Sequence, residues 1–202
     1  MEIKRNVLLN PGPATTTDTV KLAQVVPDIC PREEEFGEVM EFVSKELTKF
    51  VGSLQEYTTI LFGGSGTASV ESMISSVVSD GTLIIINNGA YGKRMCEIAK
   101  AYDISFIEFK SSNVEAIDIL ILEKVIKENK GEVSHLAVVH HETTTGLLND
   151  VEILGALCKK YNIEMMVDAM SSYAGIPIDM KAMNISYMAC LLYTSPSPRD
   201  RG

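Results

Sequence analysis

The sequence TTILFGGSGT spans Thr58–Thr67 and leads directly into an amphipathic run, Ala68–Val78. Apolar and β-branched residues followed by a glycine turn predict a strand that ends where a helix begins. The first N–H groups of a helix have no internal partners, and the helix dipole favours an anion there. The small residues allow close approach, and the hydroxyl groups of Ser65 and Thr67 add donors. The stretch therefore predicts either a phosphate-binding turn or a plain strand–helix turn.

The glycine turn matches neither common nucleotide-binding motif. Ser69 stands where G-x-G-x-x-G requires its third glycine, and no Gly-Lys-Ser/Thr follows. A dinucleotide site also predicts an acidic residue about 20 positions after the glycines, where this chain has Asn87 and Asn88. A nucleotide-binding α/β module is therefore kept only as an alternative.

Composition limits the class of protein. The chain has 202 residues, 46% of them hydrophobic, enough for one domain with a sizeable core. Its net charge of −9 disfavours nucleic acid and anionic membranes as partners, because both reward clustered Lys and Arg. No apolar run suits a signal peptide or a membrane span. The cysteines lack metal-binding spacing, and we expect buried reduced thiols and a cytoplasmic location. They are Cys30, Cys96, Cys158 and Cys190.

Strands and helices alternate after a predicted helix at Glu33–Val51. Most strand candidates are continuous apolar runs, which indicates burial on both faces and hence an α/β fold with a mostly parallel sheet between helices. Ligands of such sheets bind beyond the carboxyl ends of the strands. The strand candidates are Thr58–Phe62, Thr82–Asn87, Ser105–Phe109, Leu136–His140, Glu164–Val167 and Ile185–Met188. The helix candidates are Thr67–Val78, Gly92–Tyr102, Glu115–Glu128 and Val151–Tyr161, the last with Asn149 and Asp150 available as caps.

Polar residues follow several of these strands. Asp168 closes an apolar strand and needs a partner such as a protonated ring nitrogen, unless it is a helix cap or a metal ligand. Tyr91 either stacks on a flat ring or lies at a surface turn. His140 and His141 are adjacent and point to opposite faces, which disfavours one shared metal ion. Thr143–Thr145 form either a polar turn or donors to a phenolic oxygen. Together these features suggest a flat, phosphorylated, pyridine-like cofactor, pyridoxal 5′-phosphate.

Four segments resemble the class V aminotransferases in order and spacing: Gly63–Thr67, Gly89–Arg94, His140–Gly146 and Val167–Ser172. The resemblance runs from about Leu8 to Ala189. It implies the large domain of a fold type I aminotransferase, incomplete at the C-terminus. The implied parts are an N-terminal arm (1–30), a partial cofactor-binding domain (31–189) and a non-native tail (190–202).

The resemblance also assigns roles to residues. The cofactor phosphate would be held by Ser65, Gly66 and Thr67. Tyr91 would stack on the ring and Met170 would pack on its other face. Thr143 would lie near the ring hydroxyl, and Asp168 would pair with the ring nitrogen. The substrate entrance would be lined by Gly12, Pro13 and Arg32, with Arg32 either contacting a phosphonate or pairing with Glu33–Glu35.

Three segments look most like the members that transfer the amino group of 2-aminoethylphosphonate to pyruvate, giving phosphonoacetaldehyde and alanine. These segments are Leu8–Thr15, Asp28–Glu33 and His140–Gly146. The resemblance implies a homodimer that acts on small amine and keto-acid substrates. Alanine–glyoxylate and serine–pyruvate transaminases are the alternatives within the family.

The family's chemistry requires a lysine that forms a Schiff base with the cofactor, shortly after the strand near Ile185–Met188. This chain continues with Cys190–Pro196, which contains no lysine. Lys181 precedes that strand, and we expect it to be an ordinary solvated lysine. Cys190–Asp200 resembles a translated sequencing adapter, so we expect native sequence to end near Ala189. The alternative is a genuine divergent C-terminus. On the first interpretation the catalytic lysine is lost and this chain is inactive. A further hypothesis for the chain as written is a non-catalytic fragment that binds no cofactor.

Overall fold

The computed structural model describes residues 7–9 and 15–191, which fall into two compact units. The first unit contains residues 7–9, 15–49 and 53–61 of the described chain. It holds the short helix α1 (Asp18–Leu22) and the long helix α2 (Glu34–Lys49). The second unit contains Phe50–Gly52 and Phe62–Leu191 and holds the sheet and the remaining helices. All of the cofactor-binding residues predicted above lie in this second unit.

The predicted strand at Thr58–Phe62 is wrong, because this segment has no regular structure. A strand needs a neighbouring strand for its backbone hydrogen bonds, and no described strand pairs with it. Its Thr59 bonds to helix α2 instead. The Ser44 hydroxyl donates to the Thr59 carbonyl at 2.6 Å, and the hydroxyl groups of Thr48 and Thr59 lie 2.8 Å apart.

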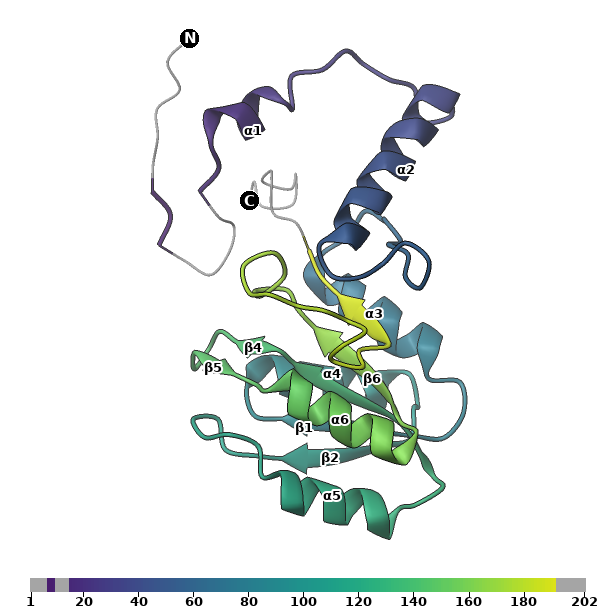
Figure 1. The fold of residues 1–202 in the computed structure, drawn as a ribbon, viewed down its shortest axis with the longest axis vertical. Coiled ribbons are helices and arrows are strands. Elements are labelled where there is room, and N and C mark those ends of the chain that lie inside the picture. Colours follow the sequence, from purple (N-terminus) through teal and green to yellow (C-terminus); the bar gives the residue numbers. More distant parts are fainter. Residues whose placement is uncertain (1–6, 10–14, 192–202) are drawn as a thin grey trace. The chain divides into compact units, whose positions relative to one another are not determined.

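The described part of the second unit forms a five-stranded parallel sheet in the order β2-β1-β3-β6-β7 (Figure 1). This confirms the predicted α/β class and the parallel sheet. Each strand was predicted to within a few residues of its position. The strands are β1 (Thr82–Asn87), β2 (Phe106–Lys110), β3 (Val133–Val139), β6 (Glu164–Asp168) and β7 (Tyr187–Ala189).

Helices cover both faces of this sheet, with α5 and α6 in front of it and α3 and α4 behind it in Figure 1. The rear core joins the apolar side of α3 and α4 to alternate strand residues such as Leu83, Ile85, Ala137 and Val139. The intervening residues Ile84, Ile86, Leu136 and Val138 are equally buried and face the other side. The helices are α3 (Gly66–Val77), α4 (Ala90–Ala101), α5 (Ile119–Glu128) and α6 (Val151–Tyr161).

Capping side chains explain where three of these helices begin. Ser65 accepts a hydrogen bond from the Ala68 N–H at the start of α3, and Asp118 caps α5 in the same way. Asp150 caps α6 through the Ile153 N–H at 3.0 Å, which confirms one of the two predicted caps. The other candidate, Asn149, is buried and bonds to neighbouring strands instead.

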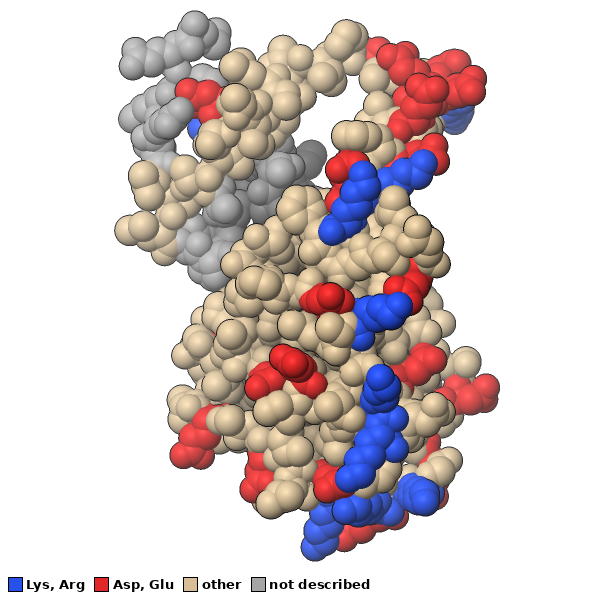
Figure 2. Space-filling model, viewed as in Figure 1, with Lys and Arg blue, Asp and Glu red and all other residues tan. Residues whose placement is uncertain are grey.

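Charged side chains of both signs are interspersed over α5 and α6 on the face seen in Figure 2. Glu123 of α5 joins the two helices. Its carboxylate lies 2.7 Å from the Lys160 Nζ and 3.3 Å from the Lys127 Nζ. These two lysines are therefore neutralised locally. Exposed ion pairs of this kind contribute little to stability. Because their charges cancel, they also do not make this surface basic.

The direction of the strands gathers the polar residues at one edge. In β3 and β6, Val139 lies beside Asp168, so the residues that follow both strands meet beyond the sheet. A two-stranded hairpin, β4 (His141–Glu142) and β5 (Leu147–Leu148), continues from β3 at this edge. The hairpin was not predicted. It reverses at Gly146, whose φ of 79° is costly for residues with a side chain.

The cysteine prediction is only partly correct. Cys96 and Cys158 are buried free thiols, and burial raises the pKa of Cys158 to about 12. Cys190 is half-buried, while Cys30 is exposed, contrary to expectation. Among the helices in residues 7–9 and 15–191, none combines the length and apolar character that a membrane span requires.

The contact between α6 and the segment before β7 can be tested at Gly155. A Cβ atom there would lie 1.7 Å from the Met183 carbonyl oxygen. We predict that Gly155→Ala lowers the free energy of unfolding by at least about 2 kcal/mol, because backbone must move. Urea unfolding followed by circular dichroism measures this.

The matched control is Gly37→Ala in α2, where no atom lies within 4 Å of the added Cβ. This variant should gain about 0.5–1 kcal/mol, the usual difference between the two residues in a helix. Wild-type stability in Gly155→Ala would contradict the packing described here.

Candidate functional site

The amino end of α3 presents backbone N–H groups at the edge of the sheet. Ser65 caps the helix, its Oγ accepting from the Ala68 N–H at 3.2 Å and its carbonyl from the Ser69 N–H at 3.1 Å. No other described residue bonds to the N–H of Gly66 or Thr67. Thr67 is also exposed, so its hydroxyl is accessible. This arrangement can bind an anion such as a phosphate group.

Met170 connects this helix end to the sheet. A Cβ atom added to Gly66 would lie 2.8 Å from the Met170 sulfur. The absence of a side chain at Gly66 therefore lets the two segments pack together. Leu191 also lies against Gly66, at 3.5 Å from the same position. The structure therefore brings Gly66 and Met170 together, although they are distant in sequence.

Asp168 ends β6 with a buried carboxylate, only 5% exposed. Its Oδ1 accepts a hydrogen bond from the Met170 N–H at 3.0 Å. Burial raises the pKa of Asp168 to about 6. The negative charge of Glu142 adds to this increase, and the Met170 N–H opposes it. A cation beside this carboxylate would remove the cost of keeping it charged, and a protonated ring nitrogen is one such cation.

Glu142 contacts both Tyr91 and the turn at Thr143–Thr145, called the threonine turn below. We had predicted no individual role for Glu142. The Glu142 Oε2 accepts from the Tyr91 N–H at 3.2 Å, in the first turn of α4. Its Oε1 accepts from the Thr144 hydroxyl at 2.8 Å. Thr143 is half-buried and lies between Glu142 and Thr144 in the sequence, and the Tyr91 side chain is 46% exposed. Tyr91 is thus available to a ligand rather than packed in the core.

None of the three predicted substrate residues belongs to the described part of the second unit. Gly12 and Pro13 lie outside the described residues. Arg32 is exposed and belongs to the first unit. Their proposed roles therefore stay predictions.

Lys181 lies at the opposite end of the sheet from Asp168. The adjacent Met180 N–H donates to the Val51 carbonyl, and Ser186, just before β7, donates to Met165 near the start of β6. Lys181 is exposed, in agreement with the expectation of a solvated side chain. It is too far along the strands to act at the carboxyl edge.

The two histidines bond to neighbouring serines after β6. The His140 Nδ1 lies 2.9 Å from the Ser172 Oγ, and the His141 Nδ1 lies 3.2 Å from the Ser171 Oγ. Burial, together with the adjacent His141, lowers the pKa of His140. The His140 N–H also donates to the Asp168 carbonyl at 2.9 Å. These contacts fasten the turn after Asp168 to the end of β3.

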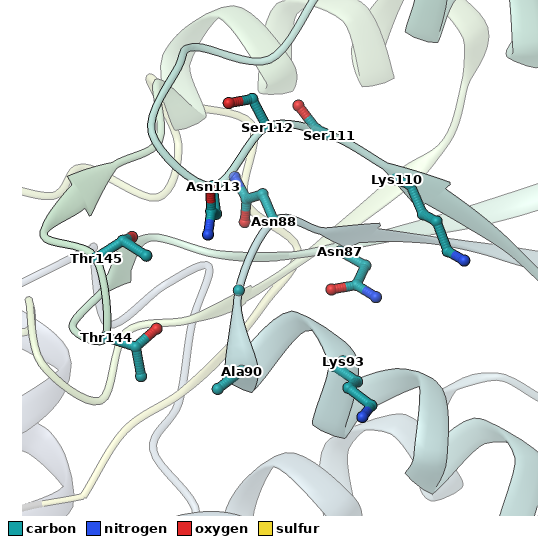
Figure 3. A pocket seen from close by; sticks show the side chains of 11 residues that line it. Asn87, Asn88, Ala90, Lys93, Lys110, Ser111, Ser112, Asn113, Thr144 and Thr145 are labelled. Atoms are coloured by element: carbon teal, nitrogen blue, oxygen red, sulfur yellow. The ribbon is translucent and has the colours of Figure 1, made fainter.

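A cavity of about 640 Å³ opens beyond the ends of β1 and β2 (Figure 3). Lys93 and Lys110 lie on one side of it, and Thr144 and Thr145 on the other. None of the seven predicted cofactor residues lines this cavity, although Ala90 and Thr144 are their immediate neighbours. The cavity is therefore a separate space where an anion could meet two lysines.

A buried pair of amides lies between this cavity and β3. Asn88 donates from its Nδ2 to the Asn149 Oδ1 at 2.8 Å, and Asn149 donates to the Val139 carbonyl at 2.7 Å. The Asn88 Oδ1 has no hydrogen-bond partner. Among the described residues it is the sole buried side-chain polar atom that lacks one. The pair explains why Asn149 does not cap α6.

Asp168 makes the stability of the cofactor-free protein depend on pH. Its folded pKa of about 6 lies above the ordinary value of 3.8, so the folded state holds the proton more tightly. Stability is therefore lost as the pH rises through this range, and the cost is fully present above about pH 6. We predict that Asp168→Asn raises the free energy of unfolding at pH 7.5 by on the order of 2 kcal/mol, with a smaller gain at pH 5.

Urea unfolding of both proteins at the two pH values measures this difference. Asparagine keeps an oxygen for the Met170 N–H, so the comparison isolates the charge. An equal effect at pH 5 and pH 7.5 would show that the carboxyl is not the titrating group.

Comparison with known proteins adds independent evidence. Residues 20–190 match the aminotransferase class-V family. A bifunctional phosphonoacetaldehyde hydrolase/aminoethylphosphonate transaminase of Clostridioides difficile is 42% identical over 184 residues, which is 90% of this chain and 29% of that protein. A 2-aminoethylphosphonate–pyruvate transaminase of Klebsiella pneumoniae is 37% identical over 190 residues, 93% of this chain and 51% of that protein.

Solved structures share the fold. An alanine–glyoxylate aminotransferase of Nostoc sp. superposes with a TM-score of 0.79 at 27% identity, covering 92% of this chain and 48% of that one. The chain therefore spans about half the length, or less, of the relatives it matches. Its sheet and helices are those of the large domain of a fold type I aminotransferase, in agreement with the predicted fold class. The chain belongs to the class V aminotransferase family.

Proposed function

We propose that the complete protein transfers the amino group of 2-aminoethylphosphonate to pyruvate with pyridoxal phosphate, giving phosphonoacetaldehyde and alanine. The proposal rests on the convergence of Gly66, Met170 and Asp168 at one edge of the sheet. N–H donors that have no described partner lie on one side, and a buried carboxylate lies on the other. The names of the relatives at 37% and 42% identity support the substrate.

The residues present fit pyridoxal phosphate. The N–H groups of Gly66 and Thr67 and the Thr67 hydroxyl would hold the phosphate, together with the cap residue Ser65. Asp168 would hold a proton on the ring nitrogen, because its buried carboxylate lacks a cationic partner among the described residues. When bound, the cofactor withdraws electrons from the amine carbon through this protonated ring.

Three other side chains would shape the ring site. Tyr91 would cover one face of the ring, and Met170 the other, which excludes water from both faces. Thr143 would donate to the ring hydroxyl. These assignments rest on the matching motif positions and on the partial exposure of Tyr91, Met170 and Thr143.

The proton transfers between the amine carbon and the cofactor need a base, which in this family is a lysine. Residues 182–202 contain no lysine, and residues 192–202 lie outside the described structure. Cofactor binding by this chain and turnover by the complete protein are therefore two separate proposals. The non-native origin of the tail stays a prediction.

The other proposals have weaker support. The homodimer is proposed from the family resemblance alone, and the cytoplasmic location from the free thiols. A nucleotide-binding module is disfavoured because β1 ends in Asn87 rather than in an acidic residue. Alanine–glyoxylate specificity is disfavoured because the solved protein of that name is only 27% identical.

We predict that this chain binds pyridoxamine 5′-phosphate, which carries no aldehyde and cannot react with surface lysines. Titration calorimetry should show pyridoxamine without phosphate binding at least tenfold more weakly, because the α3 donors are then unused. Adenosine monophosphate should not compete.

Thr67→Val tests the phosphate contact directly. It should weaken pyridoxamine phosphate binding by about three- to tenfold, the value of one or two hydrogen bonds. Ser72→Ala, at an exposed position on the same helix, is the matched control and should bind as the wild type does. Equal affinity for AMP would instead support a nucleotide module.

The substrate is tested on a protein that carries residues 20–190 and the second half present in its relatives. We predict faster alanine formation from pyruvate with 2-aminoethylphosphonate than with serine as the amino donor. A preference for serine with pyruvate, or for alanine with glyoxylate, would move the assignment to another branch of the family.

A further inference from the structure

Glu142 is a fully buried carboxylate, 0% exposed, that the proposed chemistry does not use. A charged group in this position is costly unless hydrogen bonds and a favourable field offset the loss of water. It has both. Two donors bond to its oxygens, the Tyr91 N–H at 3.2 Å and the Thr144 hydroxyl at 2.8 Å. It also lies at the amino end of α4, where the helix dipole favours a negative charge.

Space for this carboxylate is built into the chain. Gly89 is the N-cap residue of α4, and a Cβ there would lie 2.2 Å from the Glu142 Cγ and Cδ. Any other residue at position 89 would displace the carboxylate. Gly89 supplies no side-chain cap of its own, so Glu142 supplies the cap from 53 residues further along the sequence.

The backbone of Glu142 shapes the turn that follows it. Its carbonyl accepts from the Gly146 N–H at 2.8 Å and from the Thr145 N–H at 3.2 Å. The residue therefore closes the turn containing Thr143 with its main chain and holds the start of α4 with its side chain. Its charge also acts on Asp168, which lies close enough for the two carboxylates to repel each other.

We propose that Glu142 is a positioning residue of the cofactor site: its carboxylate fixes the start of α4, and with it the ring of Tyr91, to the turn that carries Thr143. This inference rests on the proposed function, because Tyr91 and Thr143 are ring-binding residues only if the cofactor binds there. Glu142 touches neither the substrate nor the reacting atoms in this account. It acts through Tyr91 and the threonine turn.

Hydrogen exchange tests the anchoring without any cofactor. The Tyr91 N–H is in the first turn of a helix and has no partner within the helix, so its protection depends on Glu142. We predict that Glu142→Ala accelerates exchange at the Tyr91 amide by at least tenfold, while Glu142→Gln, which keeps an acceptor oxygen, changes it far less. Asp118→Ala removes the cap of α5 and is the matched control. It should leave the Tyr91 amide unchanged.

A double-mutant cycle tests the role in binding. Glu142→Ala and Tyr91→Ala should each weaken pyridoxamine phosphate binding by about three- to tenfold, and the double variant should be little weaker than either single one. Asp118→Ala combined with Tyr91→Ala should be additive, because those residues share no contact.

The outcomes separate the two proposals. Unchanged exchange at Tyr91 in Glu142→Ala, or additive losses in the Glu142–Tyr91 cycle, would overturn the positioning role. Failure of the wild-type chain to bind pyridoxamine phosphate would instead overturn cofactor binding by this chain, while the exchange measurement would still decide whether Glu142 anchors Tyr91.

Discussion

The buried carboxylate of Asp168 is the group on which the site depends. The parallel register places it beside Val139 on one side and Ala189 on the other, at the end of a strand that is buried from Met165 onward. One backbone N–H, that of Met170, donates to it, and burial raises its pKa to about 6. A carboxyl in this state binds a cation strongly, because the cation removes the cost of desolvation. The proposed ring nitrogen is the partner that this environment favours.

The rest of the site is assembled around Asp168 by contacts between distant segments. Met170 packs on Gly66 and so fixes the amino end of α3 beside β6. His140 and Ser172 fasten the following turn to β3. Glu142 in turn joins the start of α4 to the threonine turn. Together these contacts place the N–H donors of a helix end and a buried carboxylate on one edge of the sheet.

Much of this arrangement was predictable because the strands of a parallel sheet share one carboxyl edge. Asp168, Tyr91 and the glycine turn could be identified from their positions after apolar runs. The role of Glu142 could not, since its partner N–H is 51 residues away and a glutamate beside threonines predicts only a polar turn. Gly89 was the available signal, because a glycine before a helix leaves room for a cap from elsewhere.

Other errors have equally specific causes. The segment at Thr58–Phe62 has a strand-like composition, but Thr59 bonds to α2 and the segment lacks a described neighbour. The hairpin β4–β5 has two residues in each strand, too few for a periodic signal. Asn149 resembles a cap in sequence, but it is drawn into the sheet by Asn88 and the Val139 carbonyl.

A crystal structure of this chain with pyridoxamine 5′-phosphate tests the central claim most directly. We predict the phosphate on the N–H groups of Gly66 and Thr67 and the ring nitrogen at hydrogen-bond distance from Asp168. A phosphate bound instead between Lys93 and Lys110, in the neighbouring cavity, would contradict it.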